Sequence, residues 1–242
     1  MELLLFSNST VKGRGYLEHA SGVLRDYLAP VRRLVFVPFA GADHDTYTAL
    51  VEGALRPYGV EVTGVHTERD PRAALERADA VFTGGGNTFR LVKALHERGL
   101  MTPLAEAVRA GTRYMGASAG TNIAAPTLRT TNDMPIVEPP SFGTLGLVPF
   151  QINPHYLDAD PASTHAGETR AERIREFHEE NGIPVLGLRE GTHLRVTADD
   201  GGAPKARIGG EAAGSQAPGP AVLFRPGAGP DEVAGDVSWL LS

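Results

Sequence analysis

The sequence places a serine inside a Gly-x-Ser-x-Gly motif, Gly116 to Gly120, directly after a short apolar run. The small residues on both sides of Ser118 allow the backbone to turn sharply from a strand into a helix, and such a turn exposes the serine hydroxyl. The motif is therefore typical of a nucleophile elbow. The same composition also suits a strand-to-helix connection without any chemistry, so other residues must distinguish the two interpretations.

A serine hydroxyl is a weak nucleophile unless a base removes its proton, and that base is usually a histidine oriented by a carboxylate. Among the eight histidines, His155 is the candidate, because it follows the end of a predicted strand and Pro154 restricts its approach. Two acids could orient it: Asp133 in the loop after the elbow, and Glu190 at a later strand end. Spacing does not choose between them, although a strand end is more rigid than a proline-rich loop and slightly favours Glu190.

The negatively charged oxygen that forms during attack on a carbonyl needs preorganised hydrogen-bond donors. An elbow supplies the amide of the residue after the nucleophile, here Ala119. A run of three glycines follows another predicted strand, and Gly85 and Gly86 could supply the second amide, with Asn87 beside them as a substrate-binding candidate. A glycine-rich helix start can also bind phosphate, but this one matches neither the dinucleotide-binding nor the P-loop motif, which disfavours a nucleotide site.

Composition excludes several classes of protein. The chain has 23 Lys and Arg against 29 Asp and Glu, a formal charge of -6, and it has no basic cluster, so we expect neither nucleic acid nor an anionic membrane as a partner. It has no cysteine, which excludes disulfides, thiolate metal sites and a cysteine nucleophile. We expect no metal and no cofactor. The first apolar run, which ends at Phe6, is shorter than a signal-peptide core or a membrane span, so we expect a cytoplasmic protein.

Short buried strands alternate with amphipathic helices through the first half of the chain. The strands are predicted at Leu3 to Ser7, Leu34 to Pro38, Val60 to Val65, Ala80 to Thr83 and immediately before the elbow; the helices are predicted at Tyr16 to Leu28, Tyr47 to Leu55, Asp70 to Arg77, Phe89 to Gly99 and Thr102 to Gly111. This alternation on short loops indicates an α/β fold with a mainly parallel, flavodoxin-like sheet covered by helices on both faces. Functional loops of such sheets gather at the carboxyl ends of the strands, where Ser118 and the three glycines fall.

The second half begins with a long proline-rich loop, Ala125 to Val148, which is a candidate lid. It continues with a strand, a helix, a strand and an antiparallel hairpin appended to the sheet. These are predicted at Phe150 to Asn153, Glu168 to Glu180, Pro184 to Leu188 and around Asp199 to Gly202. Because no linker divides the chain, we predict one domain over residues 1–242.

The sequence resembles the peptidase E family, serine peptidases that cleave aspartyl dipeptides and are related in fold to the class I glutamine amidotransferases. The resemblance covers all but the C-terminal part of the chain. The matching segments are Met1 to Leu5 with Ser7 to Thr10, Pro38 to Gly41, Gly84 to Phe89, Ser118 to Gly120, Arg129 to Val137, Gln151 to His155, and Gly167 to Arg170. Several of these segments are long and have unusual sequences, so a chance resemblance is improbable.

The resemblance implies that Ser118 is the nucleophile and His155 the general base, with the family's acid at either Asp133 or Glu190. It also implies that Arg170 receives the aspartate side chain of the substrate, and a guanidinium is suited to this because it pairs bidentately with a carboxylate. The chain departs from the best-known members at Ala117, where they carry a tryptophan, and this change could alter the wall of the pocket.

We therefore expect a serine dipeptidase, monomeric or homodimeric, that hydrolyses dipeptides with an N-terminal L-aspartate through an acyl-enzyme. Two alternatives stay open. One is a cyanophycinase-like serine exopeptidase that acts on β-linked aspartyl-arginine, and the other is a non-catalytic protein that binds acidic amino acids or dipeptides through Arg170. An α/β-hydrolase esterase is disfavoured, because the interval from Ser118 to Asp133 is too short for the strands and helices that would separate them.

Overall fold

The structure is a computed structural model of the chain and describes residues 1–159, 167–198, 201–213 and 218–242. Its strands are β1 Glu2–Phe6, β2 Arg33–Val37, β3 Glu61–Gly64, β4 Ala80–Thr83, β5 Arg113–Ala117, β6 Gln151–Tyr156, β7 Val185–Arg189, β8 Thr192–Thr197, β9 Lys205–Gly210, β10 Ala221–Phe224, β11 Asp231–Val233 and β12 Gly235–Asp236. Its α-helices are α1 Ser21–Leu28, α2 His44–Leu55, α3 Pro71–Arg77, α4 Thr88–Glu97, α5 Met101–Arg109, α6 Ala119–Asn122 and α7 Arg170–Glu180.

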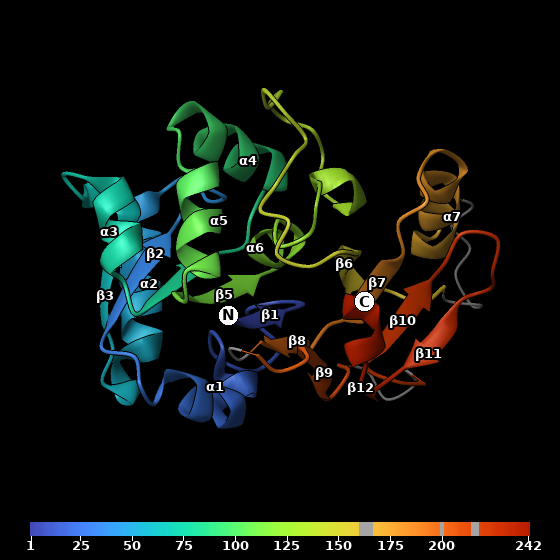
Figure 1. Cartoon of the computed structure of the whole chain (residues 1–242), viewed down its shortest axis with the longest axis horizontal. Helices are drawn as coiled ribbons and strands as arrows, with labels where there is room; N and C mark the ends of the chain where they lie inside the picture. Colours follow the sequence, from blue (N-terminus) through green and yellow to red (C-terminus); the bar gives the residue numbers. More distant parts are fainter. Residues whose placement is uncertain (160–166, 199–200, 214–217) are drawn as a thin grey trace.

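The strands form two sheets (Figure 1). The larger sheet has eight strands in the order β12-β9-β8-β1-β5-β4-β2-β3, and the smaller has four in the order β11-β10-β7-β6. The five strands from β1 to β3 in the larger sheet are parallel, whereas β8, β9 and β12 continue it antiparallel. Strands β8 and β9 are the predicted hairpin, and its turn residues Asp199 and Asp200 lie outside the described residues.

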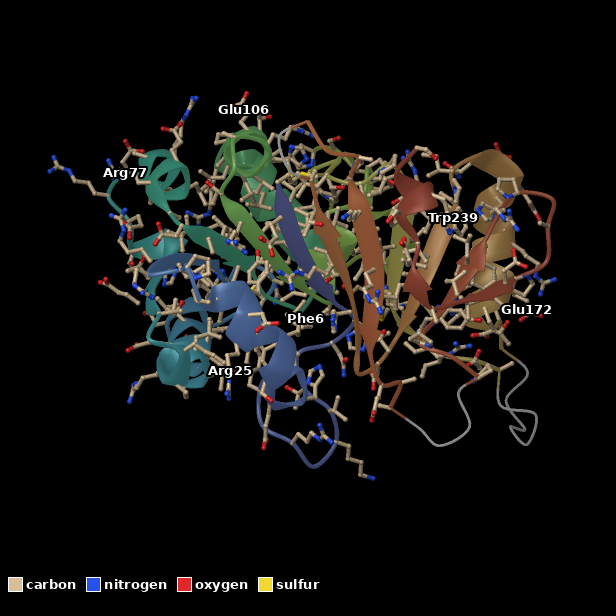
Figure 2. The ribbon with its side chains drawn as sticks, turned by 60° about the horizontal axis from the view of Figure 1, so that its bottom comes forward. Phe6, Arg25, Arg77, Glu106, Glu172 and Trp239 are labelled. Atoms are coloured by element: carbon tan, nitrogen blue, oxygen red, sulfur yellow. The ribbon has the colours of Figure 1, made fainter. Side chains whose placement is uncertain are left out.

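Helices cover both faces of the larger sheet. Successive side chains of a strand point to opposite faces, so Leu4 and Phe6 of β1 pack in one apolar cluster with side chains of α1 and α2. Leu3 and Leu5 pack in the other, with side chains of α3, α4 and α5. Figure 2 shows the side chain of Arg77 and other charged side chains of the helices on the outer surface. Phe6, by contrast, is fully buried. The predicted α/β fold, with a mainly parallel sheet and appended antiparallel strands, is confirmed.

The smaller sheet is a feature that the sequence pattern did not reveal. The sequence predicted one sheet, but strands β6 and β7 pair in parallel with each other and join β10 and β11 in a second sheet. The two sheets meet at the end of β1, where the Ser7 amide donates to the carbonyl of Thr192 and its hydroxyl donates to the carbonyl of Leu188. One apolar cluster contains side chains from both sheets, including Leu5 and Leu223.

The first helix begins later than predicted. The periodic pattern from Tyr16 is interrupted because Leu17 has a positive φ of 58°, and a short 3-10 turn follows before the α-helix starts at Ser21. The carboxylate of Glu18 accepts a hydrogen bond from the Gly15 amide, which stabilises this turn. None of the helices in the described part of the chain has the length and apolar character needed to cross a membrane.

Candidate active site

Ser118 lies between β5 and α6 in a strained conformation, with φ 53° and ψ -109°. A positive φ is uncommon for a non-glycine residue, and residues held in strained conformations cluster at functional sites. The flanking glycines are required by close packing, because a Cβ atom on Gly116 would lie 2.6 Å from the Gly120 oxygen and one on Gly120 would lie 2.0 Å from the Thr83 oxygen. The Gly-x-Ser-x-Gly segment is therefore a tight elbow that holds its serine at the carboxyl end of the sheet.

His155 faces the serine hydroxyl from the neighbouring sheet, with Nε2 2.9 Å from Ser118 Oγ. The predicted strand end at this position is an irregularity inside β6, because the pairing of β6 with β7 shifts register between Asn153 and Tyr156. His155 itself has φ 55°, again in the left-handed region. Such irregularities redirect a side chain out of the normal strand alternation.

Glu190 lies on the other side of the imidazole, directly after β7. Its Oε1 is 2.6 Å from His155 Nδ1, and the side chains of His155 and Glu190 are 38% and 40% exposed, so both are in contact with solvent. The carboxylate can only accept a hydrogen bond, which assigns the proton to Nδ1 and leaves the lone pair of Nε2 for the hydroxyl of Ser118. The three side chains form a continuous hydrogen-bonded series.

Asp133, the other candidate acid, is not brought to His155. Its carboxylate accepts hydrogen bonds from the backbone amide and the hydroxyl of Thr88, both at 2.7 Å, and from the hydroxyl of Thr131 at 3.2 Å. It thus occupies the N-terminus of α4, where a negative charge is favoured by the unpaired amides and the helix dipole.

The three-glycine segment lies against the nucleophile. A Cβ atom on Gly85 would lie 3.0 Å from the Cβ of Ser118, and one on Gly86, at φ 130°, would lie 2.5 Å from the Ala40 oxygen. Burial raises the pKa of the nearby Tyr47 hydroxyl, and this hydroxyl lies 3.2 Å from that of Tyr16. Gly85 and Gly86 both stay candidates for the second oxyanion donor.

Asn87 is the N-cap of α4. Its Oδ1 accepts from the Arg90 amide at 3.0 Å, and its Nδ2 donates to the Met134 carbonyl at 2.8 Å. An amide nitrogen has two hydrogens, and among the described residues only one of those of Asn87 has an acceptor. The other can bind a substrate.

Arg170 is the first residue of α7. The predicted helix start at Glu168 moves to Arg170 because Thr169 and Glu172 form a reciprocal capping box. The pKa of Arg170 is lowered by burial and by Arg173, and this is opposed by the negative charge of Asp133. No carboxylate within residues 1–159, 167–198, 201–213 or 218–242 lies within 4 Å of its guanidinium.

Two further positions differ from the sequence-based expectation. Ala117 is fully buried among Phe6 and Phe82, so its side chain does not form a wall of the open site. Ser7 was not a candidate, yet its hydroxyl accepts a hydrogen bond from the His155 amide at 2.9 Å. The only signal for it was an uninterrupted polar segment directly after a buried strand.

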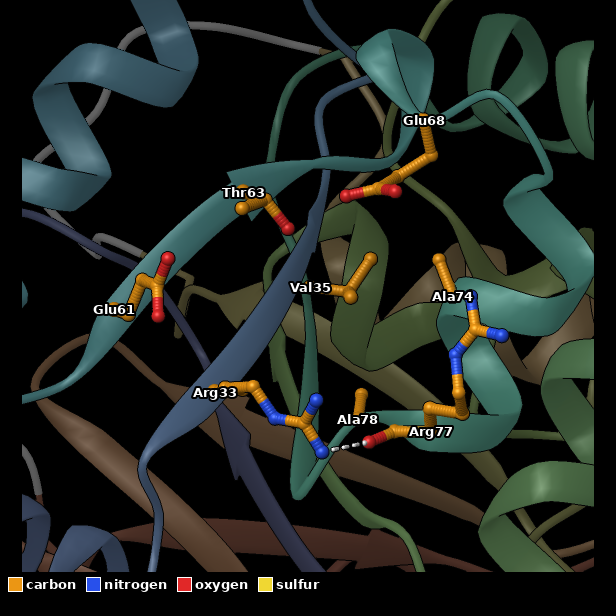
Figure 3. Close-up of a pocket in the computed structure, with 8 residues that line it drawn as sticks. All are labelled: Arg33, Val35, Glu61, Thr63, Glu68, Ala74, Arg77 and Ala78. Atoms are coloured by element: carbon orange, nitrogen blue, oxygen red, sulfur yellow. Dashed lines mark hydrogen bonds between the residues drawn. The ribbon is translucent and has the colours of Figure 1, made fainter.

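A cavity of about 150 Å³ lies elsewhere, between β2, β3 and α3 (Figure 3). It is lined by charged side chains of both signs, and Arg33 donates to the Arg77 carbonyl across it. Strand β3 is the edge of the sheet, and two strands separate it from β5. This cavity is therefore not part of the serine site.

The family model of peptidase family S51 matches residues 3–202. The chain belongs to peptidase family S51. This S51 peptidase is 63% identical over 243 residues to peptidase E of Streptomyces coelicolor, which covers 100% of the chain and 95% of that relative. The predicted resemblance to peptidase E is thus confirmed.

A further relative and a solved structure are also similar to the chain. A Drosophila melanogaster protein named probable alpha-aspartyl dipeptidase is 54% identical to the S51 peptidase over 200 residues, covering 81% of this chain and 83% of that one. The crystal structure of a peptidase from an acI-B1 actinobacterium has a TM-score of 0.62 at 14% identity and covers 96% of this chain and 93% of that one. At this identity the likeness concerns the fold alone.

Proposed function

We propose that this S51 peptidase hydrolyses dipeptides that begin with L-aspartate, through an acyl-enzyme on Ser118. The observation that carries the proposal is the hydrogen-bonded series from Ser118 through His155 to Glu190. The names of the relatives, peptidase E and probable alpha-aspartyl dipeptidase, supply the substrate class.

In the first half-reaction, Nε2 of His155 takes the proton of Ser118 as the hydroxyl oxygen attacks the scissile carbonyl. Glu190 holds the ring in the required tautomer and stabilises the imidazolium. The amide of Ala119 and that of Gly85 or Gly86 are the donors that we assign to the oxyanion. His155 then returns the proton to the leaving amine, which departs as the free second amino acid.

In the second half-reaction, water replaces the amine. His155 removes its proton, the hydroxide oxygen attacks the acyl carbon, and Ser118 leaves with the proton restored. Arg170 is the cation that we assign to the aspartate side chain of the substrate, and Asn87 is a candidate for a further polar contact. A guanidinium compensates the loss of water around a bound carboxylate.

The proposal is tested by a competition assay and a labelling experiment. The wild type is offered Asp-Leu and β-linked aspartyl-arginine together, and it is treated separately with a sulfonyl fluoride before mass spectrometry, with Ser118→Ala as the control. We expect faster cleavage of Asp-Leu and one covalent label that is absent from Ser118→Ala. Faster cleavage of the β-linked substrate would indicate cyanophycinase-like activity instead, and absence of both turnover and label would indicate a binding protein.

We further propose that residues 1–242 act as one peptidase domain, monomeric or homodimeric, in the cytoplasm. Light scattering after size-exclusion chromatography measures the oligomeric state, and cell fractionation measures the location. A larger assembly or a membrane-associated fraction would contradict this part of the proposal.

A further inference from the structure

Three consecutive residues at the end of β1 accept backbone hydrogen bonds from the three parts of the serine site. The carbonyl of Phe6 accepts from the amide of Ser118 at 3.1 Å. The hydroxyl of Ser7 accepts from the amide of His155 at 2.9 Å, and Oδ1 of Asn8 accepts from the amide of Gly191, next to Glu190, at 2.8 Å.

The two side chains in this series are buried polar groups, with exposed fractions of 0% for Ser7 and 2% for Asn8. Buried polar groups are costly unless they are hydrogen-bonded. Ser7 uses its hydroxyl as both acceptor and donor, because it also donates to the Leu188 carbonyl at 2.9 Å. Asn8 likewise uses both ends of its amide, since Nδ2 donates to the Thr10 carbonyl at 2.9 Å.

Ser7 contacts His155 where the backbone is strained. The φ of His155 is 55°, a conformation that costs a non-glycine residue free energy and persists only where the surroundings impose it. The hydrogen bond to Ser7 fixes the amide at the start of this residue. Because φ sets the direction of the side chain, the contact also sets where the imidazole lies.

Glu190 is held from both sides along the chain. Ser7 binds the carbonyl of Leu188, two residues before it, and Asn8 binds the amide of Gly191, one residue after it. Gly191 has φ 85°, and a Cβ atom there would lie 2.3 Å from the Glu211 oxygen. The turn that carries Glu190 is therefore closely packed against the backbone of Glu211 and hydrogen-bonded to Asn8.

We propose that Ser7 and Asn8 are positioning residues that set the contact between His155 and Glu190. They touch no reacting atom, and they act through the backbone of the residues that do. The kinetic part of this inference rests on the proposed dipeptidase activity, whereas the spectroscopic part does not.

The experiment compares Ser7→Ala and Asn8→Ala with a matched control, Thr130→Val. Thr130 also has a buried hydroxyl that binds β6, donating to the Ile152 carbonyl at 2.8 Å and accepting from Asn122 at 3.4 Å, but it does not contact the backbone of His155 or the Glu190 turn. For each variant we measure kcat and KM on Asp-Leu, the free energy of unfolding, and the downfield proton NMR resonance of the hydrogen bond from His155 Nδ1 to Glu190.

We expect Ser7→Ala and Asn8→Ala to lower kcat by about 10- to 100-fold with KM changed less than about threefold, because a misplaced catalytic group lowers the rate more than binding. The downfield resonance should move upfield or broaden in both. Thr130→Val should lose comparable stability while keeping the resonance, with kcat within about threefold of wild type. If Ser7→Ala does not fold, Asn8→Ala tests the same contact from the Glu190 side.

The inference would be overturned if Ser7→Ala and Asn8→Ala kept the wild-type kcat and resonance, or if their kcat fell while the resonance stayed unchanged. It would also be overturned if Thr130→Val changed kcat and the resonance as much as they do. If the wild type does not cleave Asp-Leu, the proposed function fails, and the resonance alone still tests the positioning role.

Discussion

The Nδ1 atom of His155 lies 2.6 Å from the carboxylate of Glu190, across 35 residues of sequence. The contact joins the irregular part of β6 to the end of β7, two parallel neighbours in the smaller sheet. Glu190, rather than Asp133, is therefore the acid that is placed to orient the imidazole.

Ser118 and His155 are expected to act as one unit. Ser118→Ala and His155→Ala should each lower kcat by several orders of magnitude, and the double variant should lose little more, because removal of either residue already abolishes proton transfer to the base. Steady-state kinetics on Asp-Leu measure this. Losses that simply add in the double variant would contradict a shared role.

Substitution of the two candidate acids should affect different properties, kcat for Glu190 and the free energy of unfolding for Asp133. Glu190→Gln removes the negative charge and adds an NH2 group that can donate to Nδ1, so the His155 tautomer is no longer fixed and kcat should fall by about 10³- to 10⁴-fold, with little change in stability. Asp133→Ala removes the acceptor of the Thr88 amide and should cost about 1–2 kcal/mol in the free energy of unfolding. Kinetics and urea denaturation of both variants check this, and a larger kcat loss in Asp133→Ala than in Glu190→Gln would reverse the assignment.

Arg170 is expected to select the substrate side chain. Arg170→Ala should cost about 2–5 kcal/mol in kcat/KM for Asp-Leu, the range for removing one partner of a desolvated charge pair. Arg170→Lys should restore only part of this, because an ammonium lacks the planar fork. Asn-Leu, the neutral isostere, should be a poor substrate that is nearly indifferent to the change. Equal losses on Asp-Leu and Asn-Leu would show that Arg170 supports the site without reading the side chain.

His193 should make stability depend on pH. Burial, with His19 and Arg195 nearby, lowers its pKa from 6.5 to about 4 in the folded protein. Below pH 6.5 the unfolded chain takes up a proton that the folded protein does not, so the free energy of unfolding should fall between pH 6.5 and pH 4, by about 2–3 kcal/mol. Urea titrations across this range should show the fall in wild type and a smaller one in His193→Gln. A slope unchanged by His193→Gln would assign the effect to other groups.

Arg189 should contribute to stability through a buried ionic cluster. Its side chain is 4% exposed and pairs with Asp158 and Glu232 at 2.7 Å, and these carboxylates raise its pKa. Arg189→Met would leave both acids unpaired, but each is nearly half exposed and can regain water, so we expect a loss of about 1–3 kcal/mol, below the range for a fully buried pair. Chemical denaturation measures it. A variant as stable as wild type would show that packing replaces the ion pairs.

Local patterns in the sequence were sufficient for the main α/β architecture. Runs of apolar residues bounded by turn residues predicted the parallel strands, and Asp70 before Pro71 predicted the start of α3, where the aspartate accepts from the Ala73 amide. The glycines around Ser118 predicted a tight turn. These features depend on residues close together in the chain, so short-range sterics and hydrogen bonds are enough to specify them.

Contacts between distant segments were decided only by the tertiary structure. The placement of Glu190 against His155 depends on how β6 and β7 pair outside the main sheet. The sequence favoured Glu190 over Asp133 only slightly, as an acid at a strand end. The contact from Ser7 to His155 spans 148 residues and joins two sheets. No local pattern encodes such a contact. The hydroxyl of Ser7 and the strained backbone of His155 come within hydrogen-bond distance only after the apolar faces of both sheets have packed.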